Sequence, residues 1–161
     1  MYKRQAINVI TRKKVNVKSK KIKNYIIDFS NPEDYKKVIK KENIIIASIG
    51  TTQSKVNFNK TEYRKVDYDI LLNIAKACKS NQASSFCFVS SAGANEKSKN
   101  FYLGLKGEIE NSIMHLGLKT CLIFRPSLLI GKRNEFRFGE TIAQKIMPIF
   151  SFLMKSNYKP I

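Results

Sequence analysis

The sequence predicts the α/β class, with a doubly wound parallel sheet carrying helices on both faces, in a single domain over residues 1–161. Two observations support this class. Short apolar runs, rich in β-branched residues, have the length of buried strands. Apolar residues at helical spacing separate most of these runs. The expected strands cover 6–11, 25–29, 43–49, 85–90 and 120–124.

The helices between these strands have recognisable beginnings and ends. Ser30 or Asn31 can cap a helix over 30–41, because Pro32 suits the first turn and two acidic residues follow it. Further helices are expected over 66–78, over 101–116, which stops near Gly117, and over 139–153.

Parallel strands joined by right-handed crossovers place all their carboxyl ends along one edge of the sheet, where ligands bind. The residues that follow each strand are therefore the ones to read for function. They are Arg12, Asp28, Gly50, the pair Ser90 and Ser91, and Arg125.

Composition sets limits on the class of protein. The 161 residues carry a net charge of +18, which would suit a nucleic-acid binder but also fits a generally lysine-rich composition. No apolar run approaches the ~18 residues of a membrane span, and the start lacks a signal peptide. We therefore expect a soluble, cytoplasmic protein whose cysteines are reduced and buried. These cysteines are Cys78, Cys87 and Cys121.

Tyr102 and Lys106 are the candidates for chemistry. At i and i+4 they share one face of the helix expected over 101–116. Bringing a tyrosine pKa from its ordinary ~10 to about 7 takes roughly 4 kcal/mol. A lysine charge ~4–5 Å away supplies about that much at an effective dielectric of about 20. A tyrosine tuned in this way can donate a proton to a carbonyl oxygen, which Ser91 or Ser90 could polarise.

This spacing alone is weak support, since an exposed tyrosine packing on a lysine stem would look the same. The position of the pair strengthens the hypothesis, because its helix directly follows a strand that ends in Ser90 and Ser91. His115 is expected at the surface or helix end, and Glu108 and Glu110 on a solvated face. No paired carboxylates or cysteine spacing indicate a metal site.

The chain resembles the atypical short-chain dehydrogenase/reductases of the Tat-interacting-protein type, which are NAD(P)-binding, Rossmann-like oxidoreductases. The resemblance extends over nearly the whole chain, in the family's order and spacing. It rests on ITRKK at 10–14, IDF at 27–29, SIGTTQSK at 48–55, YRKVDY at 63–68, FVSSAGA at 88–94, YLGLKGEIE at 102–110 and FRPSLL at 124–129.

The resemblance implies an NADP site. Arg12 and Lys13 fall where the family holds the 2′-phosphate, and two cations at a strand end suit that group. Asp28 is placed to meet the adenine. The cofactor would pass close to Ile49, Gly50, Leu129 and Arg137. For three of these residues a structural role is the alternative: Leu129 in the core, Arg137 at the surface and Gly50 in a turn.

The family's first strand and Gly-rich turn, which hold the pyrophosphate, have no counterpart in the sequence, and neither does its last C-terminal helix. We therefore expect the truncated form of the fold, and poor NADP binding by the chain as written.

We expect an NADP-dependent oxidoreductase that acts on a carbonyl or hydroxyl compound by hydride transfer. The alternative is a non-catalytic NADP-binding regulatory or interaction protein with the same fold and a protein partner. A nucleic-acid binder ranks well behind both, and no membrane partner is expected.

Overall fold

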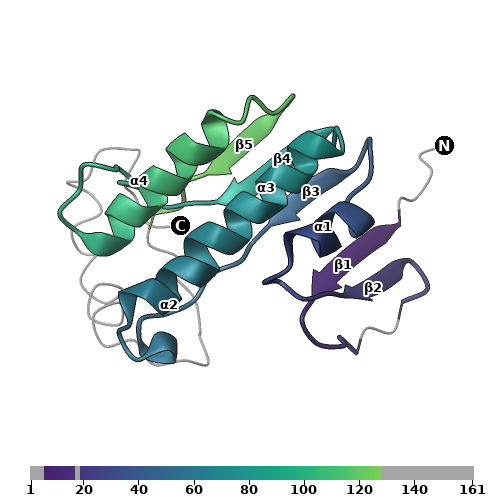
Figure 1. Ribbon diagram of the computed structural model, residues 1–161, viewed down its shortest axis with the longest axis horizontal. Coiled ribbons are helices and arrows are strands. Elements are labelled where there is room, and N and C mark those ends of the chain that lie inside the picture. The colour runs from purple at the N-terminus through teal and green to yellow at the C-terminus, as the bar shows by residue number, and fades with distance from the viewer. Residues whose placement is uncertain (1–5, 17–18, 128–161) are drawn as a thin grey trace, which may run out of the picture.

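The computed structural model describes residues 6–16 and 19–127 (Figure 1). The predicted helix over 139–153, and with it Leu129 and Arg137, lies outside these residues. The described elements follow one another as β1 (Ile7–Thr11), β2 (Ile22–Ile26), α1 (Pro32–Val38), β3 (Ile44–Ala47), a 3-10 turn (Ser54–Val56), α2 (Lys60–Arg64), a π-helical segment (Lys65–Asp69), α3 (Ile70–Ser80), β4 (Ser85–Val89), α4 (Phe101–Met114) and β5 (Cys121–Phe124).

The beginning of α1 confirms the predicted cap. Asn31 is extended and its side chain accepts the N–H of Glu33 at 3.1 Å, while Pro32 occupies the first turn. Asn31 thereby satisfies one of the amides that a helix leaves without an internal partner.

The second strand lies three residues earlier than predicted, at β2 rather than 25–29. Its parallel pairing with β1 runs from Ile7 beside Ile22 to Thr11 beside Ile26. The Asn24 side chain adds a bond to the Val9 carbonyl at 3.1 Å. Lysines within this stretch obscured its beginning in the sequence.

Every strand pair in the described part of the chain is parallel, which confirms the predicted class. The strands form a two-stranded sheet of β1 and β2 and a three-stranded sheet in the order β3-β4-β5. Because all pairs are parallel, the carboxyl ends of β3, β4 and β5 lie along one edge, as the sequence predicted.

The core lies between the three-stranded sheet and the helices α1, α3 and α4, which Figure 1 shows on one side of the strands. Tyr35, Phe86 and Ile109 are at most 1% exposed there. Helices were predicted on both faces of the sheet, but within the described residues the opposite face has none (Figure 1). That face is apolar and exposed, with Ile44 at 60% and Ile46 at 74%. Successive side chains of a strand point to opposite faces of the sheet. Those on one face are therefore covered by the helices, and those on the other face are exposed.

The loop after β4 packs directly on α4. The Asn95 amide donates to the Leu103 carbonyl at 3.1 Å, and the backbone at Asn95 and Glu96 lies against Gly107. A Cβ built on Gly107 would overlap the Glu96 nitrogen and the Asn95 carbonyl carbon. Glycine is required here for close approach rather than for backbone conformation.

We therefore expect Gly107→Ala to destabilise the fold, although alanine normally stabilises a helix interior by about 1 kcal/mol relative to glycine. The overlap involves backbone, which cannot move away as a side chain can. Thermal unfolding by circular dichroism measures this effect. Gly104→Ala is the matched control, because its nearest new contact, the Ser98 carbonyl, is 3.2 Å away. Equal midpoints for the two variants would contradict the prediction.

Candidate active site

The helix α4 presents the predicted pair on one face. Asn100 caps the helix by accepting the Leu103 N–H at 3.1 Å, directly after the loop that leaves β4. Tyr102 is half-buried and Lys106 is 4% exposed. The Lys106 Nζ lies 5.7 Å from the centroid of the Tyr102 ring. The structure therefore brings the tyrosine and the lysine together.

Lys106 has an acidic partner that was not predicted. Its Nζ donates to Asp67 Oδ1 at 2.9 Å, and the two side chains are 5% and 3% exposed. Asp67 Oδ2 accepts the Thr51 N–H at 2.8 Å. Asp67 belongs to the sequence stretch 63–68 that carried the family resemblance, which was the only signal available for it.

Both candidate serines follow β4. The Ser91 hydroxyl is half-buried and donates within its own loop, to the Ala92 carbonyl at 3.2 Å. Ser90 is 3% exposed, and its hydroxyl has no hydrogen-bond partner among the described residues. A buried hydroxyl without a partner is costly, so Ser90 has an unused donor at the edge where ligands bind in this class of sheet. The choice between the two serines remains a prediction.

The predicted cofactor contacts begin at the end of β1. Arg12 and Lys13 are exposed, and the Arg12 guanidinium carbon lies 5.9 Å from the centroid of the Phe29 ring. Among the described residues neither side chain has a carboxylate partner. Their positive charge is therefore available to an anion.

Asp28 makes a local turn. Its Oδ1 accepts the Ser30 N–H at 2.8 Å and the Ser30 hydroxyl at 2.7 Å, and these bonds hold the pKa of Asp28 below its usual range. Ile49, partly buried, packs against the core, and Gly50 is exposed beside Asp67. Asp28 and Gly50 lie at strand ends, as predicted, and their contact with a cofactor remains a prediction.

The prediction of a solvated face for Glu110 is wrong. Glu110 is 2% exposed and accepts from the Arg125 side chain, with Nε at 3.0 Å. Arg125 follows β5, so this bond joins α4 to the strand-end edge. Glu108 also has a partner, because both nitrogens of the Arg64 fork donate to its carboxylate. His115 is exposed at the end of α4, as predicted.

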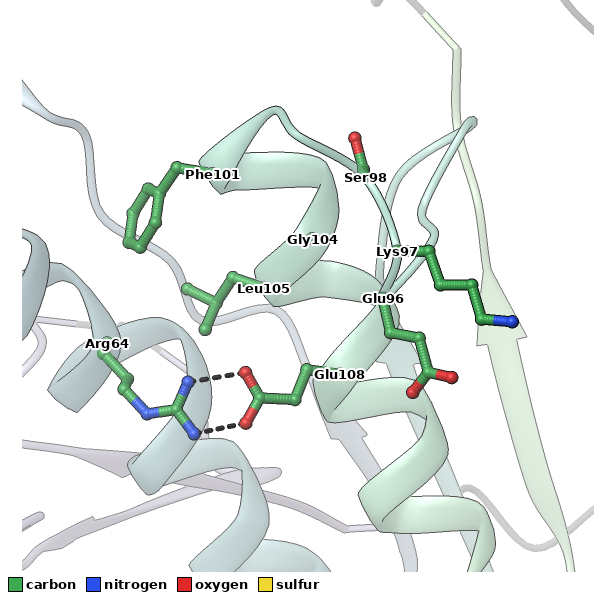
Figure 2. A pocket seen from close by; sticks show the side chains of 8 residues that line it. All are labelled: Arg64, Glu96, Lys97, Ser98, Phe101, Gly104, Leu105 and Glu108. Atoms are coloured by element: carbon green, nitrogen blue, oxygen red, sulfur yellow. Dashed lines mark hydrogen bonds and ion pairs between the residues drawn. The ribbon is translucent and has the colours of Figure 1, made fainter.

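A hollow of about 540 Å³ lies beside α4, and Figure 2 shows the side chains that line it. Arg64 and Glu108 close it on one side, Phe101 and Leu105 point toward it from two helical turns, and the loop at 96–98 lies on the other side. Tyr102 and Lys106 do not line it. The hollow is therefore separate from the candidate catalytic pair.

Within the part of the chain that the structure describes, no group of three or more His, Cys, Asp or Glu could hold a metal ion. The same part contains no helix long and apolar enough to cross a membrane. A parallel sheet covered by helices, with loops at the carboxyl ends of its strands, is the arrangement of the dinucleotide-binding α/β proteins.

Comparison with known proteins identifies the family within this class. Residues 3–119 match the family described as NAD(P)H-binding, and the chain belongs to that family. It is 32% identical to protein FMP52, mitochondrial, of Candida albicans over 88% of its own length, and 29% identical to protein HTATIP2 of Rattus norvegicus over 86%. These findings confirm the resemblance to the atypical short-chain dehydrogenase/reductases. The chain spans 64% and 58% of the length of these two relatives.

Solved structures agree on the fold. The structure of Pen from Bacillus thuringiensis matches with a TM-score of 0.67 at 19% identity, over 95% of this chain and 49% of that one. Triphenylmethane reductase of Citrobacter sp., complexed with NADP(H), matches with a TM-score of 0.55 at 16% identity, over 75% of this chain and 40% of that one.

The expected cytoplasmic location is wrong on these comparisons. Four fungal relatives, at 32–38% identity, are named mitochondrial proteins. The sequence-based expectation rested on the lack of an apolar targeting segment, which is a feature of secretory signals and not of amphipathic mitochondrial ones.

The Arg64–Glu108 pair gives an expected pH dependence. The hydrogen bonds from Arg64 lower the pKa of Glu108. A lowered folded-state pKa adds stability above the ordinary glutamate pKa of about 4.3, and this stability is lost as the pH falls below that value. Because both side chains are partly exposed, at 38% and 43%, the effect is at most about 1 kcal/mol.

Urea unfolding at neutral pH and near pH 3 tests this dependence. Glu108→Gln should lower stability at neutral pH and lose less stability than the wild type on acidification. Glu62→Gln is the control and should follow the wild type, because it removes an exposed ion pair between Glu62 on α2 and Lys65 in the π-helical segment. Parallel curves for the wild type and Glu108→Gln would count against this assignment.

Proposed function

We propose that the chain carries the catalytic residues of an NADP-dependent oxidoreductase that reduces a carbonyl compound, or runs the reverse reaction on an alcohol. The single observation that carries this proposal is the Lys106 ammonium, buried and 5.7 Å from the centre of the Tyr102 ring at the strand-end edge. Membership of the NAD(P)H-binding family supports it.

In this proposal the dinucleotide, when bound, supplies the hydride. Tyr102 donates a proton from its hydroxyl to the carbonyl oxygen as the hydride reaches the carbonyl carbon, so the product is an alcohol. Lys106 supplies the positive charge that makes the phenol a useful acid and orients the cofactor's ribose. Ser91 or Ser90 donates a hydrogen bond to the same oxygen.

The described residues fit the phosphorylated cofactor. Arg12 and Lys13 are exposed cations without described carboxylate partners at the end of β1, and a guanidinium binds phosphate through two parallel hydrogen bonds. Ser90 adds an unused buried donor at the end of β4. Arg12 and Lys13 would hold the 2′-phosphate at the end of β1, and Ser90 would contact the substrate at the end of β4.

A second candidate function is an NADP-binding regulatory protein without turnover. The observation that favours it is the Asp67 carboxylate, which already compensates the Lys106 charge at 2.9 Å. Cofactor binding without oxidation of NADPH by any carbonyl compound would support this candidate. For the cellular location, the names of the fungal relatives support mitochondria.

We expect Tyr102→Phe to reduce carbonyl-dependent NADPH oxidation by at least about 100-fold, because it removes the proton donor and leaves the ring in place. The loss of absorbance at 340 nm, with a panel of aldehydes and ketones at saturating NADPH, measures the rate. Tyr25→Phe, which removes a hydroxyl from β2, is the matched control and should keep the wild-type rate. Activity retained in Tyr102→Phe would exclude this tyrosine as the acid.

We expect the double variant Arg12→Ala/Lys13→Ala to lose its preference for NADPH over NADH, because the 2′-phosphate is the only difference between the two. Isothermal titration with both cofactors measures the change. Lys20→Ala/Lys21→Ala, which removes the same charge from the neighbouring turn, is the control for general electrostatic attraction. An equal loss in both double variants would mean that no specific phosphate site exists at Arg12 and Lys13.

A further inference from the structure

Asp67 is a buried carboxylate that the proposed reaction does not use. It is 3% exposed and lies in the middle of the π-helical segment between α2 and α3. Such segments interrupt the regular hydrogen-bond pattern of a helix and occur frequently at functional sites. Its burial needs compensation, since an ionised carboxylate away from water is costly without partners.

Its two oxygens have different partners from different parts of the fold. Oδ1 accepts from the Lys106 ammonium on α4 at 2.9 Å, and Oδ2 accepts from the Thr51 N–H at 2.8 Å. Thr51 follows Gly50 in the loop that leaves β3, at the edge where the cofactor is expected. The planar carboxylate of Asp67 therefore sets the distance between the Lys106 ammonium and the Thr51 amide.

The neighbouring glycine brings the loop close to the same carboxylate. A Cβ on Gly50 would lie 3.5 Å from Asp67 Oδ1 and 3.9 Å from Oδ2, which is ordinary contact. The carboxylate therefore lies directly against the loop backbone as well as against Lys106. A change in the position of either one must be transmitted to the other or break a buried hydrogen bond.

We propose that Asp67 is a positioning residue. It aligns the Lys106 ammonium with the Gly50–Thr51 loop, so that the distance between the lysine and the backbone on the cofactor side stays fixed. Its role in catalysis rests on the proposed function, whereas the link between Lys106 and Thr51 does not.

The link is tested without any cofactor, by amide hydrogen exchange of the purified chain. Lys106→Met removes the partner of Asp67 Oδ1, so the Asp67 carboxylate is no longer fixed in orientation and its hydrogen bond from the Thr51 N–H opens more often. The Thr51 amide should therefore exchange about tenfold faster. In Asp67→Asn the same lysine substitution should add no further change. Glu108→Gln, which breaks a different ion pair to the same helix, is the matched control and should leave Thr51 unchanged. Wild-type exchange of Thr51 in Lys106→Met would overturn the link.

The catalytic role is tested by kinetics on the same variants. Asp67→Asn keeps the shape and loses the charge, so kcat should fall by about 100-fold from misplacement of the lysine, while KM for the carbonyl compound changes by less than about threefold. Asp67→Glu restores the charge one methylene away and should recover part of kcat. A kcat equal to that of Glu108→Gln would overturn the role.

Two further outcomes keep the conclusions separate. Should Asp67→Asn fail to fold, Asp67→Glu alone decides the role, because wild-type kcat and Thr51 exchange in that variant would overturn it. A wild-type chain that shows the Thr51 coupling but oxidises no NADPH with any carbonyl compound would contradict the proposed function and leave the link established.

Discussion

The buried ion pair between Lys106 and Asp67 is the interaction on which the geometry of the site depends. Removing two charges from water costs several kcal/mol for each ion, so each side chain is held where its partner can compensate it. The pair joins α4 to the π-helical segment, and the Thr51 amide extends it to the end of β3. The position of the lysine beside Tyr102 is therefore determined by tertiary contacts and not by helical spacing alone.

Local features of the fold were predictable where a single turn determines them. Asn31 and Pro32 predicted the beginning of α1 correctly, because capping depends only on neighbouring residues. The second strand was placed three residues too late, since Lys21 and Lys23 looked like a solvated loop. Pairing with β1 decided that boundary, and pairing is a contact between segments that the local pattern does not contain.

The same distinction explains the site. Tyr102 and Lys106 were predictable because residues four apart on a helix share a face. Asp67 lies 39 residues from Lys106 in sequence, and no local pattern links them. Glu110 was misread for the same reason: its partner Arg125 belongs to the next strand end, and a glutamate near a helix surface resembles a solvated one until that partner is known.

The contact between Gly107 and the backbone at Asn95 and Glu96 has a consequence for how freely the loop after β4 can vary. The tyrosine helix and the loop that carries the serines meet through main-chain atoms at this point. Side chains of that loop, such as those of Lys97 and Lys99, can therefore be exchanged without altering the spacing between Tyr102 and the serines after β4. Variants of this loop that keep Gly107 should therefore leave the packing of α4 unchanged.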